Sequence, residues 1–257
     1  MFNNRFILCV SAVTCMLFAV AFGQEWQKLP GKGTDIGAGA DGSLWVIGTE
    51  GDPNGNSIFE FNKDDHAWVK TSSGTGINIS VGPKGIPWIV NKKGEIFRRK
   101  GKNWEQIPGT ARDVAVGGDG SAWMTGTETD KDGGGIVNKW NEGDWKWVKL
   151  TGEGVRIAVG PKGVAWLVNK KNEIYRKKKT TWQKMPGGAQ DIGIGADGSV
   201  WVVGTDKQDH GSSIFKWNEA DFKWEKKTGS AIRITVGPDG TAYVVNDQNE
   251  IFQTKTK

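Results

Sequence analysis

Catalytic side chains are scarce in this sequence of 257 residues. The two histidines, His66 and His210, occupy different positions of a repeated pattern, and neither lies beside a serine or cysteine nucleophile. Both cysteines, Cys9 and Cys15, precede residue 24, so the rest of the chain has no thiol for catalysis or metal binding. No phosphate-binding glycine-rich loop and no HExxH motif is present. The sequence therefore predicts a protein that is not an enzyme.

Aromatic, amide and guanidinium side chains at repeated spacing suit a different chemistry, the non-covalent binding of a ligand. A ligand ring can stack on an exposed indole face, while fixed amide or charged groups bind its polar atoms. Trp140 and Trp217 are two aromatic candidates for such contacts. The other candidates are Trp88 with Asn91 and Arg98, Trp166 with Asn169 and Arg176, and Tyr243 with Asn246.

Two roles stay open for the three asparagines. Each follows its aromatic residue by three positions, which places the two side chains on opposite sides of a strand. The members of a set therefore need not line one cleft. An asparagine at this point also suits the corner of a tight polar hairpin, as in NKKGE at residues 91–95.

Eleven of the 14 tryptophans fall into two columns of a repeat. A tryptophan present in nearly every unit fills the same gap between sheets each time, so packing is the first interpretation and ligand stacking the second. Trp140, Trp145 and Trp217 occur only in the longer units, and Trp145 shares its column with Phe222 and His66. Packing and ligand contact are equally open for these three. The first column is Trp26, Trp68, Trp104, Trp147, Trp182 and Trp224, and the second is Trp45, Trp88, Trp123, Trp166, Trp201 and Tyr243.

The first column marks six units, separated by 42, 36, 43, 35 and 42 residues. Within each unit apolar residues recur at period two, and Gly, Asp, Asn and Pro separate the runs, which predicts four short antiparallel strands and no helix. Six such units predict an all-β, six-bladed β-propeller over residues 24–257, in which each sheet is buried against its neighbours. The strand that begins at Trp26 is expected to complete the last blade and close the ring non-covalently.

Charged residues alternate at the predicted start of the innermost strand of each unit. Long units have aspartate there, and short units have asparagine or arginine. We expect Asp113, Arg156, Asp191 and Arg233 to pair across neighbouring blades near the axis, because unpaired buried charges are costly. Six solvated side chains at a channel mouth are the alternative. The positions are Asp35, Asn78, Asp113, Arg156, Asp191 and Arg233.

Residues 1–23 have the pattern of a secretory signal peptide, with one positive charge at Arg5, an apolar run and small residues before Gln24. A membrane anchor is the alternative, although the run is short for a span. The prediction is a secreted protein with no membrane insertion. Without Arg5 the formal net charge is +4, mildly basic and scattered, which suits a polyanionic surface and gives no reason to expect nucleic acid.

The loops of the long units are rich in Asp, Asn and Gly, for example TEGDPNGNS at residues 49–57. Such residues supply oxygen ligands for calcium, but none of the loops has EF-hand spacing. A solvated turn is the first interpretation and bound calcium the second. No cofactor is expected.

The short units resemble the tectonin repeat. The resemblance is carried by IxVGPKGxxWxVNKKxEI[FY]xR, followed by Wxx[IM]PG, and versions of it extend over essentially all of residues 24–257. The long units depart from it, with GT and an insertion where the family has asparagine. The resemblance implies a six-bladed propeller.

Secreted tectonin-type proteins, including fish-egg and horseshoe-crab haemolymph lectins, bind glycans, often on bacterial surfaces. The resemblance therefore implies a multivalent lectin for cell-surface or bacterial glycans such as lipopolysaccharide, active in innate immunity. Other members are interaction modules, so a protein-binding scaffold is the alternative. The sequence does not indicate the oligomeric state.

Overall fold

The computed structural model describes residues 25–130 and 133–255 of the chain. These residues are all-β, and the one departure from strand and loop among them is a three-residue 3-10 turn, η1 (Pro83–Gly85). The expected all-β class, with no helix, is therefore confirmed for the described residues. The expected signal peptide, residues 1–23, lies outside them.

Two four-stranded antiparallel sheets lie at the two ends of the described chain. The first has the order β2 (Asp35–Ala38), β3 (Leu44–Asp52), β4 (Gly55–Asn62), β5 (Ala67–Gly76). The last has the order β20 (Arg233–Val236), β21 (Ala242–Val245), β22 (Glu250–Thr254), β1 (Trp26–Lys32). The first strand of the chain thus pairs with the last, in a register that places Trp26 opposite Thr254.

Two seven-stranded sheets lie between them. One runs β6 (Asn78–Val81), β7 (Pro87–Val90), β8 (Glu95–Lys100), β9 (Asn103–Val116), β10 (Ala122–Thr129), β11 (Gly135–Asn141), β12 (Lys146–Gly154). The other runs β13 (Arg156–Val159), β14 (Ala165–Val168), β15 (Glu173–Lys178), β16 (Thr181–Ile194), β17 (Val200–Gln208), β18 (Gly211–Asn218), β19 (Lys223–Ala231).

The long strands β9 and β16 each pair in two halves. Residues 103–110 of β9 pair with β8, and residues 111–116 of β9 pair with residues 122–126 of β10. Residues 181–188 of β16 pair with β15, and the remainder of β16 pairs with β17. The pairing therefore defines strand groups, numbered here along the chain. They are group 1 (β2–β5), group 2 (β6–β8 and the first half of β9), group 3 (the second half of β9 and β10–β12), group 4 (β13–β15 and the first half of β16), group 5 (the second half of β16 and β17–β19) and group 6 (β20–β22 and β1).

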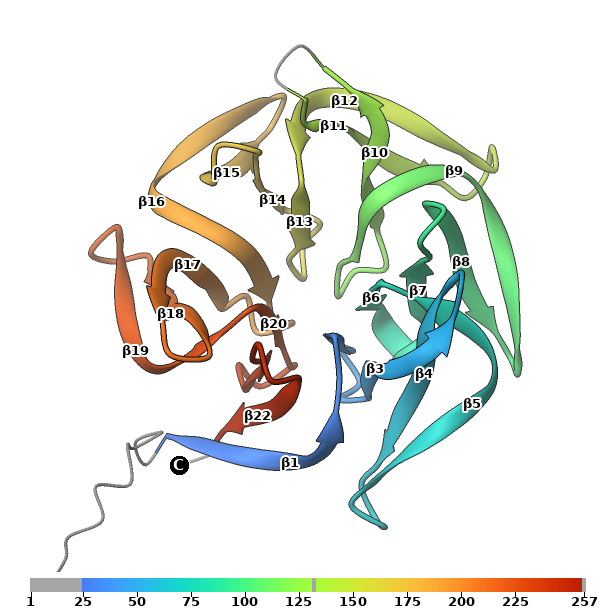
Figure 1. Ribbon diagram of the computed structural model, residues 1–257. Coiled ribbons are helices and arrows are strands. Elements are labelled where there is room, and N and C mark those ends of the chain that lie inside the picture. The colour runs from blue at the N-terminus through green and yellow to red at the C-terminus, as the bar shows by residue number, and fades with distance from the viewer. Residues whose placement is uncertain (1–24, 131–132, 256–257) are drawn as a thin grey trace, which may run out of the picture.

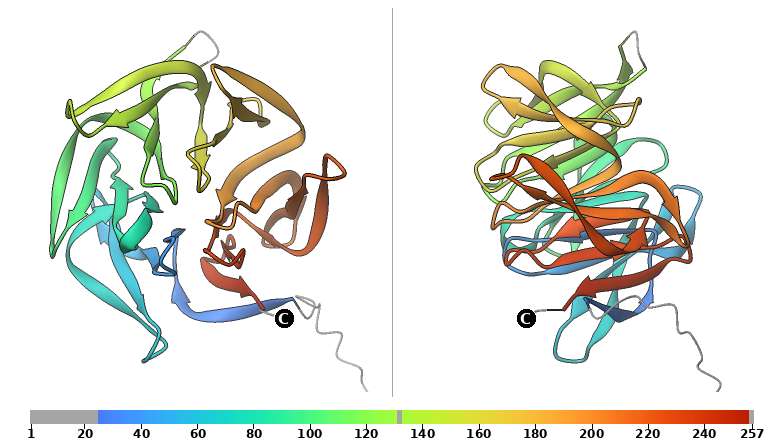
Figure 2. Two further views of the ribbon diagram at one scale, coloured as in Figure 1. Left: turned by 180° about the vertical axis from the view of Figure 1, so that it is seen from behind. Right: turned by 90° about the vertical axis from the view of Figure 1, so that its left-hand side faces the viewer.

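The groups are curled sheets arranged in a ring, with the first strand of each group nearest the axis (Figure 1). Seen from behind, β1 and β22 again lie side by side (Figure 2). Successive strands within a group are antiparallel, so the loop after the first strand and the hairpin after the third lie on one face of the ring. We call this the hairpin face. It carries all the clefts discussed below except those that contain Asn91 and Asn169.

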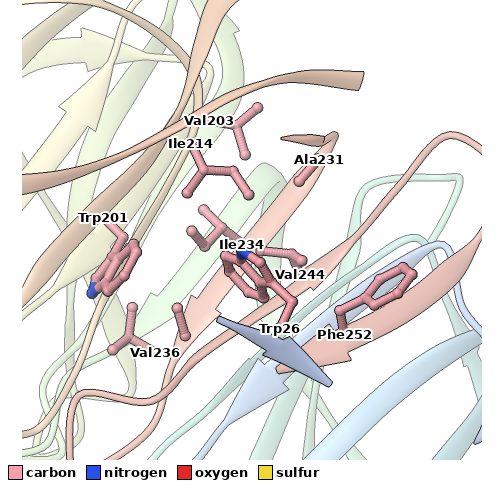
Figure 3. Close-up of a cluster of buried hydrophobic side chains, with 10 residues drawn as sticks. Trp26, Trp201, Val203, Ile214, Ala231, Ile234, Val236, Val244 and Phe252 are labelled. Carbon is pink, nitrogen blue, oxygen red and sulfur yellow. The ribbon is translucent and has the colours of Figure 1, made fainter. Parts of the chain in front are cut away.

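The hydrophobic core is divided among the contacts between neighbouring groups. One cluster joins Trp201 and Ile214 of group 5 to Ile234 and Val244 of group 6, with Trp26 beside them (Figure 3). Five further clusters each draw residues from two adjacent groups. No group can cover both of its apolar faces alone, which explains why the chain repeats one pattern.

The first tryptophan column is a packing device between groups. Each indole N–H donates to a backbone carbonyl of the preceding group. In addition, Gly74, at φ +89°, lies so close to the Trp104 ring that a Cβ there would be 2.2 Å from Nε1. The donors and acceptors are Trp26 to Thr228, Trp68 to Pro30, Trp104 to Ser73, Trp147 to Pro108, Trp182 to Thr151 and Trp224 to Pro186.

Candidate functional site

One guanidinium, that of Arg98, organises the boundary between groups 2 and 3, which we call the Arg98 cleft because its side chains match those of the cleft between groups 4 and 5. Trp88 of β7 and Arg98 of β8 are paired across the sheet, and the Arg98 Cζ lies 5.3 Å from the centroid of the Trp88 ring. Arg98 donates hydrogen bonds to Glu105 (2.8 Å) and, across the cleft, to Glu142 (2.8 Å). The Trp140 indole N–H donates to the same Glu142 carboxylate at 2.6 Å. Arginine, glutamate and two indoles therefore form one connected unit across the cleft.

The same arrangement recurs between groups 4 and 5. Arg176 lies 5.3 Å from the Trp166 ring centroid and donates to both Glu219 oxygens, at 2.9 and 2.8 Å. Trp217 Nε1 donates to Glu219 at 2.5 Å. These four side chains line a cleft of about 400 Å³. Both predicted aromatic–arginine pairs thus sit in matching surroundings, and each predicted long-unit tryptophan joins its pair.

Burial limits what the predicted tryptophans offer to a ligand. Trp88 and Trp166 are each 4% exposed, and Trp140 and Trp217 are each 9% exposed. In these two clefts the second-column indoles are covered by the arginines and pack in the core. These four indoles form the base of the clefts, and their faces are occupied by protein.

The exposed aromatic surface belongs instead to Trp145 and Phe222. They are 42% and 45% exposed, and each stands edge-on to the tryptophan behind it, with centroids 5.2 Å apart for Trp145 and Trp140 and 5.0 Å for Phe222 and Trp217. The Arg98 Cζ lies 5.4 Å from the Trp145 ring centroid. The sequence placed these two in one column and left ligand contact open for Trp145, but neither was among the named candidate residues.

Both exposed aromatics have an uncommon backbone conformation. Trp145 has φ 52° and Phe222 has φ 50°, the left-handed region that favours glycine and asparagine. The preceding turn is built by Asn141 and Asn218, whose side-chain oxygens accept from the N–H of Asp144 and Asp221. A hairpin turn of this form usually ends on glycine, so a bulky ring here costs about 1–2 kcal/mol.

The third copy, between groups 6 and 1, has different polar groups. Tyr243 is half-buried, and burial raises the pKa of its hydroxyl. The arginine position is Gln253, the glutamate position is Lys63, and the exposed aromatic position is His66, with φ 49° and its ring edge-on to Phe61 at 5.3 Å. The backbone shape is kept while the arginine–glutamate pair is lost.

The candidate asparagines lie away from the arginine clefts. The Asn91 Oδ1 accepts from the N–H of Lys93 and Glu95, and its amide donates to the Glu95 carboxylate. Asn169 and Asn246 make the same set of bonds in their own hairpins. All three are buried, so their geometry is that of the hairpin corner.

Asn91 and Asn169 border a second kind of cleft, on the opposite side of their groups. Asn91 lines it with Trp104, and Asn169 lines it with Tyr175 and Trp182. The expected alternation along the strand is therefore observed, since neither of these two clefts includes the aromatic–arginine pair of its set. A role of these clefts in binding stays a prediction.

The two cross-cleft carboxylates are held in the charged form. The hydrogen bond from Arg98 is the main cause that lowers the pKa of Glu142. The hydrogen bond from Trp217, followed by that from Arg176, lowers the pKa of Glu219. Each cleft thus presents a fixed guanidinium donor beside a fixed carboxylate acceptor. A hydroxyl group both donates and accepts hydrogen bonds, so this arrangement can bind one.

Buried aspartates and half-buried arginines surround the axis, and one ion pair, Arg156 with Asp191, forms within the expected set of four. Arg156 Nε lies 3.4 Å from Asp191, and Arg233 Nε lies 3.7 Å from Asp35, each pair joining neighbouring groups. Arg233 thus pairs with Asp35, which was not among the four residues expected to pair. Asn78 is the one uncharged residue of the six; it is buried, and its side-chain oxygen accepts from the N–H of Val114.

The axial aspartates also link the groups through the backbone. The carboxylates of Asp35, Asp113 and Asp191 accept from the N–H of the next group's first strand, each at 2.8 Å; the donors are Ile79, Ile157 and Ile234. Burial raises the pKa of Asp35 to about 7 and that of Asp113 to about 6. The axial aspartates therefore link neighbouring groups, and the charge of Asp35 and Asp113 depends on pH.

The described residues, 25–130 and 133–255, contain no group of three His, Cys, Asp or Glu side chains that could hold a metal ion. In the first long loop, Asp52 accepts from the N–H of Asn54 and Gly55, as in a self-contained turn. The described residues contain no helix long and apolar enough to cross a membrane.

The curled sheets and the repeated inter-sheet tryptophans define an all-β repeat protein of propeller-like form. A family model, the Tectonin domain, matches residues 75–257, and the chain belongs to the tectonin family. A relative, Tectonin-2 of Physarum polycephalum, is 29% identical and is matched over 55% of this chain and 48% of its own length. The chain spans about half the length of this curated relative.

Two solved structures are similar in fold. A structure described as YCF48 bound to D1 peptide has a TM-score of 0.59 at 16% identity, covering 92% of this chain and 99% of that one. A streptogramin B lyase structure has a TM-score of 0.59 at 15% identity, covering 90% and 97%. At these identities the likeness shows the fold alone. The tectonin family is non-enzymatic, and the distant lyase likeness does not assign catalysis to this chain.

Proposed function

We propose that this protein is a secreted, multivalent, non-enzymatic lectin that binds glycans on cell or bacterial surfaces, with lipopolysaccharide as one such target. The observation that carries the proposal is the pair of exposed aromatic rings, Trp145 and Phe222, held in a left-handed backbone beside an arginine–glutamate pair. Backbone strain persists where the surroundings enforce it and is concentrated at functional sites. Two bulky rings kept exposed at that cost support a role in ligand contact.

The cleft chemistry matches a sugar. The C–H face of a pyranose packs on Trp145 or Phe222, and its hydroxyls donate to the glutamate and accept from the arginine. Arg98 is already bonded to Glu105 and Glu142, so it is oriented before the ligand arrives. Preorganised polar groups reduce the entropy lost on binding. Trp88 and Trp166 support the arginines from behind.

We further propose that the strand groups are the six blades of a propeller and that β1 closes the ring. The hydrogen-bonded register of β1 with β22 supports closure, as does the bond from Trp26 to Thr228 in group 5. Closure by hydrogen bonds and packing suits a chain whose cysteines both precede residue 24. A closed ring fixes the clefts relative to each other on the hairpin face.

Two equivalent clefts on one rigid body support multivalent binding. A single sugar site is weak, but simultaneous engagement of two sites on a repetitive surface raises the apparent affinity by about 10²–10⁴. The third cleft lacks the arginine and the glutamate, so we assign it a different preference or none. Secretion follows from the predicted signal peptide, and the proposal involves neither nucleic acid nor membrane insertion.

Protein binding is the second candidate function. The similar structure described as YCF48 bound to D1 peptide is a propeller-like chain in complex with a peptide. Exposed Val69 and Val148 on the outermost strands are apolar surface that a protein could contact. This surface lacks the repeated arginine–glutamate pair, so we rank protein binding there below glycan binding at the arginine clefts.

The test is a glycan array that includes bacterial lipopolysaccharides, probed with the purified protein. The lectin proposal expects a coherent set of related sugars, competed by the free sugar. The double variant Trp145→Gly, Phe222→Gly should lose this signal, whereas Val69→Ser, on the outermost strand, should keep it. Silence of a folded wild-type sample, or an unchanged signal in the double variant, would reject the proposed clefts.

A further inference from the structure

The loops Gly82–Gly85 and Gly160–Gly163 have the same sequence, GPKG, but differ in conformation. Lys84 has φ 62° and ψ 26°, while Lys162 is not among the residues with positive φ. The sequences first differ at the next two residues, Ile86–Pro87 in place of Val164–Ala165. A proline restricts the residue before it to extended conformations, and Ile86 has φ −86° and ψ 106°.

The two lysines consequently border different clefts. Lys162 lines the cleft of Arg176, between groups 4 and 5. Lys84 lines a cleft between groups 1 and 2, which has a volume of about 720 Å³ and lies on the hairpin face. A lysine in the left-handed region is an uncommon, strained residue, and here the strain coincides with its placement at this larger cleft.

Positive charge dominates the cleft of Lys84. Its lining contains five cationic side chains and two carboxylates. One carboxylate, Glu105, is bonded to both Arg98 and Lys100, at 2.8 and 2.7 Å. The cationic residues are Lys84, Arg98, Arg99, Lys100 and Lys102, and the carboxylates are Glu60 and Glu105.

Three of the cations have no ion-pair partner among the described residues. Lys84, Arg99 and Lys102 have no carboxylate within ion-pair distance in residues 25–130 and 133–255. Arg99 stacks on Trp104, with Cζ 5.3 Å from the ring centroid, and its buried Nη1 has no hydrogen-bond acceptor. A buried donor without an acceptor is costly, and an oxyanion would supply the acceptor.

Glu60 opposes an anion in this cleft. Burial raises the pKa of its carboxyl, Arg99 lowers it, and Asp41 raises it further. The other two long units have Lys139 and Lys216 at this position, each 5.3 Å from its tryptophan ring centroid. The negative charge of Glu60 therefore interacts with Arg99 and repels an anion in the cleft, which limits the affinity.

We propose that the cleft between groups 1 and 2 is an anion site that binds a phosphate or sulfate ester carried by a sugar. Lys84 and Lys102 supply ammonium donors from two loops, and Arg99 supplies a planar donor from β8. Ile86, which is 38% exposed, offers apolar surface at the same rim for the carbon skeleton. The site shares Arg98 and Glu105 with the Arg98 cleft, but its proposed anion donors, Lys84, Arg99 and Lys102, belong to neither the Arg98 cleft nor the Arg176 cleft.

The experiment is a calorimetric titration of the full-length protein with glucose 6-phosphate, glucose 6-sulfate and glucose. We expect either or both of the charged sugars to bind and glucose not to bind at this cleft. The two charged sugars distinguish phosphate from sulfate as the preferred group. In the double variant Lys84→Asn, Lys102→Ala, binding should weaken about tenfold or more, since two charge-assisted hydrogen bonds to the anion are lost. Asparagine tolerates the left-handed backbone, so the loop is kept while the charge is removed.

Matched variants make the outcome specific. Lys162→Asn changes the lysine of the identical loop and should leave binding of the charged sugar unchanged. Glu60→Gln removes the opposing carboxylate and should tighten it. Equal weakening by Lys84→Asn and Lys162→Asn, or no effect of either, would overturn the proposal. Retained binding in Trp145→Gly, Phe222→Gly would separate this site from the proposed lectin clefts, whose failure on the glycan array is a separate result.

Discussion

Replacing Trp145 with glycine should weaken ligand binding at its cleft about tenfold or more, while it lowers the free energy of unfolding by only about 1 kcal/mol. The ring loses an edge-on contact with Trp140, worth about 0.5–1.5 kcal/mol, and a cation–π contact with Arg98, worth about 0.5–1 kcal/mol. Glycine adds about 0.5–1 kcal/mol of unfolded-state entropy but relieves about 1–2 kcal/mol of left-handed strain at φ 52°. The net change in the free energy of unfolding is then about 1 kcal/mol.

The neighbouring Trp140→Ala variant provides the contrast. Trp140 is 9% exposed, packs in the cluster between groups 2 and 3, and donates to Glu142. Truncation of a buried tryptophan costs about 3–5 kcal/mol. Two tryptophans whose rings are in contact are therefore expected to differ in stability effect by at least about 2 kcal/mol.

The assay combines urea denaturation with retention on immobilised lipopolysaccharide. Trp145→Gly should unfold near the wild-type midpoint and show retention reduced about tenfold or more at its cleft, measured in a Phe222→Gly background to silence the second cleft. If Trp145→Gly destabilises the protein as much as Trp140→Ala does, the exposed ring is a packing element. If retention is unchanged, the ring does not contact the ligand. Either result refutes the reasoning.

Two further predictions concern the seams between groups and the axis. Gly74→Ala places a Cβ 2.2 Å from Trp104 Nε1 and should lower the free energy of unfolding by about 3–6 kcal/mol. Gly101→Ala is the control, because Gly101 also has positive φ but nothing lies within 4 Å of its Cβ position, and it should cost about 1–2 kcal/mol. Equal losses in urea melts would contradict the role of Trp104 in packing between groups. Asp35 has its pKa raised by burial from 3.8 to about 7, so the folded state binds more protons than the unfolded state between these values. The free energy of unfolding should therefore fall as pH rises from about 4 to 7, and Asp35→Asn should flatten this slope; identical pH profiles would contradict it.

Much of the fold follows from local pattern in the sequence. Period-two runs and the evenly spaced first-column tryptophans predict short strands and contacts between sheets, and Trp104 bonded to Ser73 beside Gly74 shows the physical reason. A tryptophan that repeats in every unit serves the contact that every unit makes with its neighbour. The family resemblance drew on the same repeated residues, and the family match supports it.

The clefts were less predictable, because they depend on which groups face each other in space. Arg98 and Glu142 are 44 residues apart and meet only when two groups pack. The exposure of Trp145 depends on a left-handed turn residue, which its side-chain type does not suggest. The two GPKG loops show the limit most directly, since four identical residues place Lys84 and Lys162 at different clefts.

The three paired units of this chain offer an internal comparison of structural and functional positions. The position whose indole bonds the preceding group is tryptophan in all six units. The cleft position is Trp145, Phe222 or His66, and its backbone is left-handed in all three. The partner positions vary with it, since the copy with His66 also has Gln253 and Lys63 instead of arginine and glutamate.

These positions change together while their backbone conformation stays the same, so the fold does not require a particular side chain at them. The arginine, the glutamate and the exposed aromatic ring change as a set, although the glutamate and the ring lie in a different group from the arginine. Direct contact across the cleft also links these positions, because Arg98 is bonded to Glu142 at 2.8 Å and its Cζ lies 5.4 Å from the Trp145 ring centroid. Joint replacement is expected when the three side chains share a ligand, and this argument holds whichever sugar occupies the clefts.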